Sequence, residues 1–420
     1  MSRPGATVTG VGLVTPLGRD PVAFFEALLA ARTGLSTPPP GHPAHGWLEA
    51  AGIAPPVDPL EVLPPREVRG VDRFVLLALA AAKDALADAG LVVGRDADPE
   101  RVAVVVATGG AGLESFELQS RRRFERGRPG VSPYLLPGML ANMATARIAI
   151  QHGIRGYSST ISTACAAGAQ AVAEALRLIR GGEADVVVCG GAESPLHPTI
   201  AAAFANSRAL AGNWSDPAAA SRPFDSRRNG FVLGEGSAVL VIERTAHADA
   251  RGVGGYADLV GWGGSSDAHH PTAPRPDGSG AAASMRLALA SAGLATGDVD
   301  YVSAHGTGTK SGDLAETRGL HAVFGADGPA VSSVKGCTGH LLGASGAVEA
   351  VAGVFSVACG ALPPTANLES PDPACDLDHV RGAARTGPVG AVLSNSFAFG
   401  GHNISLLFAP TTAAARRRPR

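Results

Sequence analysis

The chain has 420 residues, and its 35 lysines and arginines nearly balance 37 aspartates and glutamates, for a formal net charge of −2. This balance argues against a broad basic surface of the kind that binds nucleic acid. The longest apolar helical pattern, residues 74–91, contains Lys83, Asp84 and Asp88, so it does not predict a membrane span. No stretch near the N-terminus has the charged and then apolar layout of a signal peptide, and we expect a cytoplasmic protein.

Five cysteines are present, an odd number without the paired spacing that holds zinc or the even count of a closed disulfide set. We therefore expect neither a metal site nor a disulfide framework. Glycines number 55 and aromatic residues make up only 5% of the chain, so helices and sheets are expected to pack through small side chains.

Strand and helix patterns alternate along the chain. In the first part we predict strands at 5–14, 101–107, 186–191 and 237–243, helices at 22–31, 71–90 and 170–180, and a proline-rich exposed segment at 37–65. In the second part we predict strands at 258–263, 299–304, 330–334, 391–394 and 404–408, with helices at 280–292, 313–324 and 346–359. Such alternation predicts an α/β fold.

The small-residue turn at Cys165 and the helix that follows have a counterpart at 339–359. This similarity hints at two related halves without proving them, and we place one at 1–255, with Cys165, and one at 256–410, with His305, Lys335 and His340. Residues 411–420 end in a run of arginines, and we expect a disordered basic tail there. A short terminal charge run is usually solvated, so it does not indicate nucleic-acid binding.

Cys165 lies in the sequence Ser-Thr-Ala-Cys-Ala-Ala-Gly, directly before the amphipathic pattern at 170–180. Its small neighbours leave room for a bulky ester to approach the sulfur. A helix that begins here would direct the positive end of its dipole at the thiol, which lowers the thiol pKa and favours the nucleophilic thiolate. A buried structural cysteine is the alternative, and this segment alone does not decide between the two.

Two histidines follow predicted strands in glycine-rich loops: His305 in HGTGT and His340 in SVKGCTGH. Catalytic groups of α/β folds gather at such strand ends. Lys335, five residues before His340, is one of three lysines in a chain that otherwise uses arginine, and lysine is a compact charge whose pKa can shift. Together with Cys165, these residues suggest a nucleophile served by two bases or hydrogen-bond donors.

Over residues 5–409 the chain resembles the elongating β-ketoacyl-acyl-carrier-protein synthases, type II condensing enzymes of the thiolase-like family. The motifs that carry the resemblance occur in family order: VTGVGLVTPLG at 8–18, TAC at 163–165, RPFD at 222–225, GFVLGEG at 230–236, the two histidine motifs, and NSFAFGGHN at 395–403. The resemblance implies a five-layered αβαβα fold built from two similar halves, a dimer, and no cofactor, with substrates carried on the phosphopantetheine arm of an acyl carrier protein.

The reaction implied by the resemblance is a decarboxylative Claisen condensation. Cys165 would take the acyl chain, and its backbone N–H and that of Phe399 would form the oxyanion hole. His305 and His340, as neutral imidazoles, would donate N–H bonds to the malonyl thioester and stabilise the enolate. The sequence does not say which histidine contributes more to decarboxylation.

Supporting roles are implied in the same way. Lys335 would orient the histidines through a network that includes Glu316, and its charge would keep them neutral. Thr307 and Thr309 match threonines that bind the pantetheine arm, with ordinary turn chemistry as the alternative reading.

The acyl pocket departs from the family pattern in two places. Gly110 stands where many relatives have a bulky aliphatic gate, which predicts a wider or longer channel. Ala398 precedes the gating Phe399 where glycine is usual, which predicts altered gating because alanine has less backbone freedom. Tyr134 resembles a residue that reaches into the partner subunit's pocket and helps to set its depth.

Acyl carrier proteins are usually acidic, so a local basic patch is expected to dock them. Candidates for this patch are Arg66, Arg69 and Arg73 near a helix start, and Arg208, which matches a family docking position. A second basic cluster comprises Arg121, Arg122, Arg123, Arg126 and Arg128, and a solvated face is the alternative for most of these residues.

Other functions fit the sequence less well. A thiolase would carry a second cysteine in the glycine-rich segment at 395–403, and an initiating synthase would lack the Lys335 and His340 motif. A non-catalytic chain-length partner would lose Cys165, and a module that only binds carrier protein would not need the whole set. A catalytic subunit active only as a heterodimer with a chain-length-factor partner stays open, as does the choice between fatty-acid and polyketide synthesis.

Overall fold

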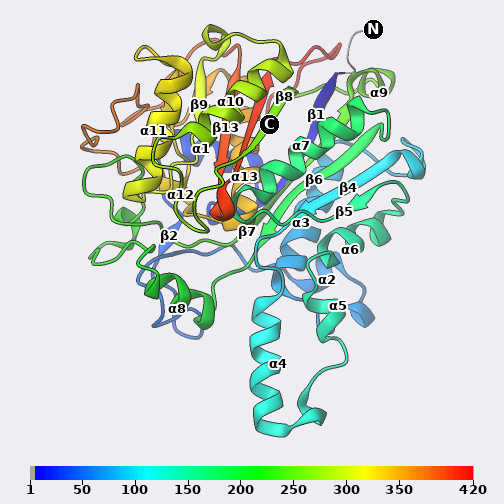
Figure 1. Cartoon of the computed structure of the whole chain (residues 1–420). Coiled ribbons are helices and arrows are strands. Elements are labelled where there is room, and N and C mark those ends of the chain that lie inside the picture. Colours follow the sequence, from blue (N-terminus) through cyan, green and yellow to red (C-terminus); the bar gives the residue numbers. More distant parts are fainter. Residues whose placement is uncertain (1–4, 420) are drawn as a thin grey trace.

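The computed structural model describes residues 5–419, and its core is one hydrogen-bonded sheet of ten strands (Figure 1). The first half of the chain supplies β1 (Ala6–Val14), β4 (Val102–Ala107), β5 (Ser158–Ser159), β6 (Val186–Glu193) and β7 (Gly236–Arg244). The second half supplies β8 (Ala257–Ser266), β9 (Tyr301–Ser303), β10 (Ala330–Ser332), β13 (Val392–Phe397) and β14 (His402–Ala409).

The two halves of the sheet have the same topology. The strand order is β5-β4-β6-β7-β1 in one half and β10-β9-β13-β14-β8 in the other, which is the same order of first to fifth strand. In each half the three strands farthest from the centre pair in parallel and the remaining pairs are antiparallel. The halves join where β1 pairs with β8, at Thr7 with Asp258 and Val8 with Ala257. Two similar halves are therefore confirmed for the fold.

Helices form three further layers around the half-sheets. The outer face of the first half is covered by α3 (Arg73–Asp88) and α6 (Met143–His152), and that of the second by α10 (Ser279–Ala292) with α11 (Lys310–Phe324) beside it. Between the half-sheets lie α7 (Ala167–Arg180) and α13 (Ser345–Cys359), which pack against each other and against strands of both halves. The layers alternate αβαβα, as the resemblance predicts.

Helix α3 illustrates how small residues set the distance between layers. It begins at the N-cap Asp72, whose side chain accepts a hydrogen bond from the Phe74 N–H. It then lies directly on β1, where a Cβ at Gly10 would come within 2.3 Å of the Ala85 carbonyl oxygen, and one at Gly12 within 2.1 Å of that of Ala81. The glycines of the first motif are therefore required for this helix to contact the strand.

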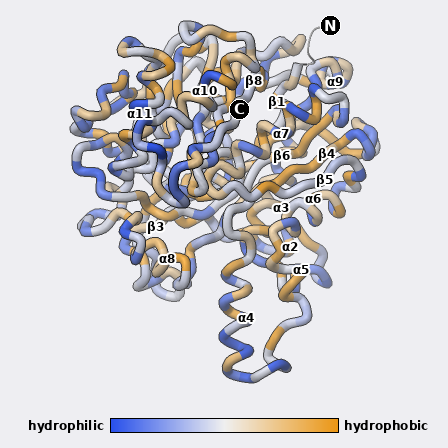
Figure 2. Tube along the Cα trace, in the orientation of Figure 1, coloured by the Kyte–Doolittle hydropathy of each residue, from blue (hydrophilic) through white to orange (hydrophobic). Residues whose placement is uncertain are grey.

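Helix α13 is strongly apolar, and the tube of Figure 2 shows that strands β4 and β6 are strongly hydrophobic as well. Residues 342–359, which include α13, are long and apolar enough to cross a membrane by length and composition alone. However, 83% of that stretch is buried between the layers, which is the pattern of a core helix.

A helical arm that the sequence patterns did not predict projects from the body of the molecule (Figure 1). It comprises α4 (Leu113–Arg126), which returns through residues 127–134 to α5 (Leu135–Met139). Most of α4 is exposed, and its far end is hydrophilic (Figure 2). The second arginine cluster of the sequence belongs to this arm. Shorter helices are α1 (Pro21–Leu29), α2 (Pro59–Val62), α8 (Pro198–Asn206), α9 (Thr245–Ala250) and α12 (Lys335–Thr338), and the remaining strands are β2 (Leu35–Ser36), β3 (Ala51–Gly52), β11 (Ala361–Leu362) and β12 (Arg385–Thr386).

The prediction of a disordered tail at 411–420 is wrong for residues 411–419. Thr411 and Thr412 donate hydrogen bonds to the buried carboxylate of Asp258, and the Arg417 guanidinium pairs with Asp88 at 2.7 Å. The arginine run predicted a solvated segment. However, Thr411 and Thr412, which precede it, supply hydrogen bonds to the buried carboxylate of Asp258 near the start of β8.

Removing residues 411–420 should therefore lower the free energy of unfolding by at least about 2 kcal/mol, because a buried acceptor without its donors costs roughly 1–3 kcal/mol. Thermal and urea unfolding would measure the change. Removal of residues 418–420 alone keeps the contacts of Asp258 and Asp88 and serves as the control. Equal melting temperatures for the two truncations would contradict the structural role of this segment.

Candidate active site

Cys165 lies in a tight turn between two layers. The preceding residue, Ala164, has a left-handed backbone conformation with φ of 49°, and residues 164–166 form a single 3-10 turn that leads into α7. The thiol is buried, the Nε2 of His340 lies 3.0 Å from its sulfur, and the backbone N–H of Phe399 donates to it. The turn therefore presents the sulfur to groups from the second half of the chain.

The prediction that the helix dipole lowers the thiol pKa is wrong in its net effect. Burial raises the pKa of the Cys165 thiol to about 12, although the charge of Lys335 and the N–H of Phe399 act in the opposite direction. Removal of the thiol from water therefore outweighs the favourable charges around it. In the free protein the group is a neutral thiol.

The two predicted histidines face each other beside this thiol. The rings of His305 and His340 lie 5.4 Å apart at 86°, and Nδ1 of His340 lies 2.9 Å from the Ser345 hydroxyl at the start of α13. Burial, and after it the positive charge of Lys335, hold the pKa of both imidazoles well below the ordinary value. Both rings are therefore neutral at physiological pH.

The Lys335 ammonium fixes the tautomer of His305. It donates to the His305 carbonyl oxygen at 2.6 Å and lies 3.3 Å from Nδ1 of the same ring. Because an ammonium group has no lone pair, Nδ1 accepts and the ring hydrogen is on Nε2. That N–H is left free to donate to a bound substrate.

The carboxylate that pairs with Lys335 is Glu349, which the sequence analysis did not identify. The two side chains form a buried ion pair, each 1% exposed. Burial raises the pKa of Glu349 to about 7, and the lysine opposes that shift. The available signal was that Glu349 is the one charged residue in the apolar helix at Ser345–Cys359.

Glu316 has a different role from the one predicted. Its carboxylate accepts the backbone N–H groups of His305 and Gly306, at 2.9 and 2.7 Å, instead of pairing with Lys335. It therefore holds the backbone of the histidine loop, and the Lys335 side chain is held by Glu349.

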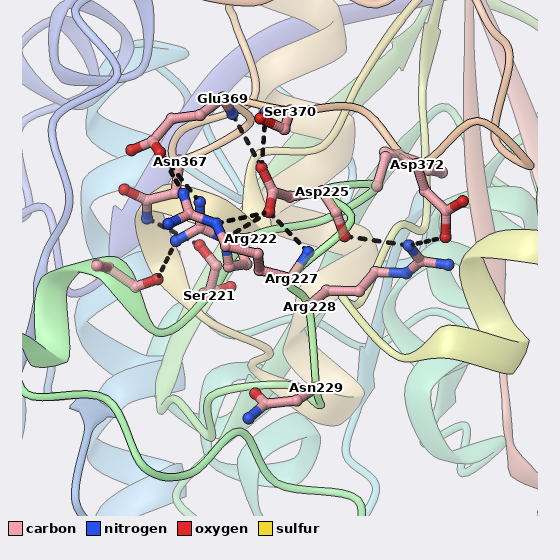
Figure 3. A network of polar contacts seen from close by, with 12 residues as sticks. Ser221, Arg222, Asp225, Arg227, Arg228, Asn229, Asn367, Glu369, Ser370 and Asp372 are labelled. Atoms are coloured by element: carbon pink, nitrogen blue, oxygen red, sulfur yellow. Dashed lines mark hydrogen bonds and ion pairs between the residues drawn. The ribbon is translucent and has the colours of Figure 1, made fainter.

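A polar network around the RPFD motif supports the same loop (Figure 3). Arg222 pairs with Asp225 at 2.9 Å, and Asp225 also accepts the backbone N–H groups of Glu369 and Ser370. Arg228 lies 3.1 Å from Asp313, which accepts the N–H groups of Phe224 and Gly308. The motif thus ties the His305 loop to the segment at 367–372.

Two cavities meet at Cys165. The larger, of about 670 Å³, is lined by Thr307, Thr309 and the exposed Arg208 among others. The smaller, of about 210 Å³, is mainly apolar and includes Gly110. Cys165 and Phe399 line both, so the thiol lies at the junction of the larger cavity, which has the more polar lining of the two, and the smaller, mainly apolar one. Among residues 5–419 there is no cluster of three or more side chains suited to a metal ion.

In the observed conformation of the Phe399 segment, Ala398 is not strained, while altered gating stays a prediction. Ala398 is extended, with φ of −128°, a conformation that any residue adopts. Positive φ values occur instead at Gly400 and Gly401, at 84° and 74°. Backbone freedom near Phe399 therefore resides after the aromatic residue, and alanine at 398 costs nothing in this conformation.

The other predicted pocket and docking residues are dispersed. Tyr134 is exposed at the start of α5 and lines neither cavity of its own chain. Arg66, Arg69 and Arg208 are exposed. The prediction that Arg73 docks a carrier protein is wrong. Its guanidinium donates two hydrogen bonds to Glu235, at 2.6 and 2.8 Å, and is not free to bind a partner.

Comparison with known proteins agrees with this geometry. Residues 6–248 match the model of the β-ketoacyl synthase N-terminal domain, and residues 256–369 match that of the C-terminal domain. The 3-oxoacyl-[acyl-carrier-protein] synthase 2 of Synechocystis sp. is 42% identical over 403 residues, which are 96% of this chain and 97% of that protein.

Solved structures give the same result. The ishigamide ketosynthase/chain length factor superposes with a TM-score of 0.91 at 32% identity, covering 98% of this chain and 100% of that one. A type II polyketide synthase ketosynthase, solved with its acyl-carrier protein and a hexaketide, gives a TM-score of 0.90 at 29% identity with the same coverage. The chain therefore belongs to the β-ketoacyl synthase family, the carbon–carbon bond-forming acyltransferases that its motifs resemble.

Proposed function

We propose that this protein joins an acyl group held on Cys165 to the two carbons left when a malonyl group loses carbon dioxide. The observation that carries the proposal is the junction of two cavities at a thiol, where His340 Nε2 lies 3.0 Å from the sulfur and His305 faces it. A nucleophile at such a junction can receive a chain from one side and store it on the other.

In the first step the Cys165 sulfur attacks the carbonyl of an acyl thioester. The new carbon–sulfur bond replaces the one to the incoming pantetheine sulfur, which leaves with the thiol proton. We assign the backbone N–H groups of Phe399 and Cys165 to stabilisation of the negative oxygen; in the free protein the N–H of Phe399 donates to the sulfur. Because the thiol is neutral at rest, it loses its proton only as substrate binds.

In the second step a malonyl thioester enters the larger cavity and loses carbon dioxide. The neutral rings of His305 and His340 donate N–H bonds to its thioester oxygen and stabilise the enolate that remains. The enolate carbon attacks the acyl carbonyl, and the Cys165 sulfur leaves and regains a proton. The product is a β-ketoacyl thioester, and the scheme uses no cofactor.

The larger cavity suits a phosphopantetheine arm on an acyl carrier protein. Thr307 and Thr309 line it, and Arg208, Arg275 and Lys310 are exposed along its wall. Cations at the mouth attract both a phosphate and an acidic partner. We assign carrier docking to Arg208, Arg275 and Lys310, and to Arg66 and Arg69. We also propose that the enzyme is soluble and cytoplasmic.

We propose that the protein is a dimer, and the apolar side chains exposed on and beside the helical arm support this proposal. Tyr134, Leu136, Leu140, Ile150 and Tyr157 are each at least 41% exposed, near the edge strand β5. Contiguous exposed apolar residues commonly mark subunit interfaces. A homodimer is the simpler assembly, while likeness to a ketosynthase/chain length factor structure supports a catalytic subunit of a heterodimer as the second candidate.

Incubation with acyl-carrier thioesters should add one acyl mass to the protein, and the Cys165→Ala variant should add none. Intact-mass spectrometry measures the adduct, and added malonyl-carrier protein should convert it to β-ketoacyl product. Cys359→Ala, a partly exposed thiol outside both cavities, is the control and should behave as wild type. If only a mixture with a chain-length-factor partner becomes acylated, the heterodimer is correct; acylation of Cys165→Ala would refute the nucleophile.

Replacing the buried pair by neutral groups in Lys335→Met/Glu349→Gln should move the acidic limb of condensation to higher pH. The Lys335 charge helps to hold the pKa of both imidazoles down, so its loss raises that pKa and protonates the donors sooner as pH falls. Single-turnover condensation of pre-acylated enzyme against pH measures the shift. Lys83→Met is the control, and a superimposable profile in the double variant would contradict the electrostatic role.

Gly110→Ile should reduce acylation by long chains at least about tenfold while short chains change little, since one or two carbons in an apolar pocket change kcat/KM by roughly 10–200-fold. A Cβ at Gly110 would contact Glu193 and Leu113 at 3.3 Å, so further carbons extend into the smaller cavity. Gly297→Ile, where nothing lies within 4 Å of an added Cβ, is the control. An unchanged chain-length profile would show that Gly110 does not set pocket size.

A further inference from the structure

The smaller cavity contains two polar groups that the reaction does not use. His197 and Ser194 both line it, and they are 2% and 5% exposed. Within residues 5–419, neither Nε2 of His197 nor Oγ of Ser194 has a hydrogen-bond partner. Buried polar side chains in proteins are nearly always paired. The two unpaired atoms each have less than 1 Å² of accessible surface, so a bound chain pairs with them only after a small rotation of the side chains.

The other polar group of this cavity is already satisfied. The carboxylate of Glu193 accepts the backbone N–H groups of Gly109, Gly110 and Gly343, at 2.6 to 2.9 Å, and the hydroxyl of Thr108 at 3.1 Å. Glu193 therefore shapes the wall of the cavity. Its carboxylate has less free hydrogen-bonding capacity for a substrate than His197 and Ser194 have.

A neighbouring carboxylate on the helical arm orients His197. The Nδ1 atom lies 2.8 Å from Oε2 of Glu117, which is also approached by the backbone N–H of Thr199. These contacts hold the pKa of Glu117 below its ordinary value although burial acts against them, so Glu117 is ionised and can only accept. Nδ1 therefore carries a hydrogen, and in the neutral ring Nε2 presents a lone pair.

We propose that this pocket binds acyl chains that carry a hydroxyl group along their length. A hydroxyl can donate to Nε2 of His197 and can accept from the hydroxyl of Ser194, which matches the two unpaired groups of the cavity. This assignment rests on the proposed function, because the chain reaches this cavity when it is bound to Cys165.

A saturated chain would be at a disadvantage in the same pocket. Its methylene groups would cover Nε2 and Oγ without offering either a partner, and a buried polar group left unpaired lowers affinity. Sites built to bind a hydroxyl reject the analogue that lacks it more strongly than apolar sites reject an added carbon. The pocket therefore selects by chemistry as well as by length.

The test compares acylation of Cys165 by a saturated acyl-carrier thioester with that by positional isomers of the same chain carrying one hydroxyl or one ketone. Rates of adduct formation are followed by intact-mass spectrometry. At least one hydroxyl isomer should exceed the saturated chain about tenfold in kcat/KM. His197→Asn keeps a donor for Glu117 but has no Nε2, and it should bring the ratio close to one.

Ser194→Ala should reduce the same preference in part. Ser356→Ala is its matched control, because Ser356 is also buried with an unpaired hydroxyl but lies on α13 outside both cavities. Thermal melting of each variant shows whether it is folded.

Several results would overturn the assignment. Equal or faster acylation by the saturated chain in the wild-type protein would refute it while leaving the condensing function intact. A preference for ketone over hydroxyl would refute the lone pair on Nε2. A hydroxyl preference that survives His197→Asn would place its source elsewhere. If no thioester acylates Cys165 in the presence of candidate partners, the proposed function fails and the assignment fails with it.

Discussion

The buried ion pair between Lys335 and Glu349 is the contact on which both the fold and the site depend. Burying two charges is costly unless geometry and further hydrogen bonds compensate, and here the ammonium also donates to His305. The pair fastens the central helix α13 to the loop that carries the histidine. The same charge lowers the pKa of both imidazoles and opposes the rise of the Cys165 pKa. The same ion pair therefore links α13 to the His305 loop and lowers the pKa of both imidazoles.

The repeated topology explains why groups so distant in sequence meet. Strands β9 and β10 are parallel neighbours with Ser303 opposite Ser332, so the residues after them, His305 and Lys335, emerge at the same sheet edge. The two central helices also begin at this point. Cys165 lies in the turn before α7, and Ser345, which contacts His340, is the first residue of α13. Each half of the fold therefore places one strand-to-helix turn at the site where Cys165 and His340 meet.

The helices, strands and loops that could be predicted from the sequence are those encoded by local residue patterns. Apolar strands, amphipathic helices and glycine-rich loops identified nearly the whole sheet and the residues Cys165, His305, His340 and Lys335. The sign of the Cys165 pKa shift was missed because burial depends on tertiary packing, which local sequence does not record. Arg73 was misassigned for the same reason, since its partner Glu235 is remote in sequence. The arm around α4 escaped notice because α4 is predominantly hydrophilic, so its arginines were interpreted as a charge cluster and not as part of a helix.

The neutral resting thiol and the unpaired groups of the pocket point to one principle of selection. Burial raises the pKa of the Cys165 thiol, so its reactivity depends on how a bound substrate is placed. Under the proposed function, placement is decided in the smaller cavity, where Gly110 is predicted to leave the chain length open and His197 and Ser194 are proposed to require a hydroxyl. A chain that satisfies that demand is held in register at the sulfur. One that leaves these groups unpaired binds less tightly and reaches the reactive position less often.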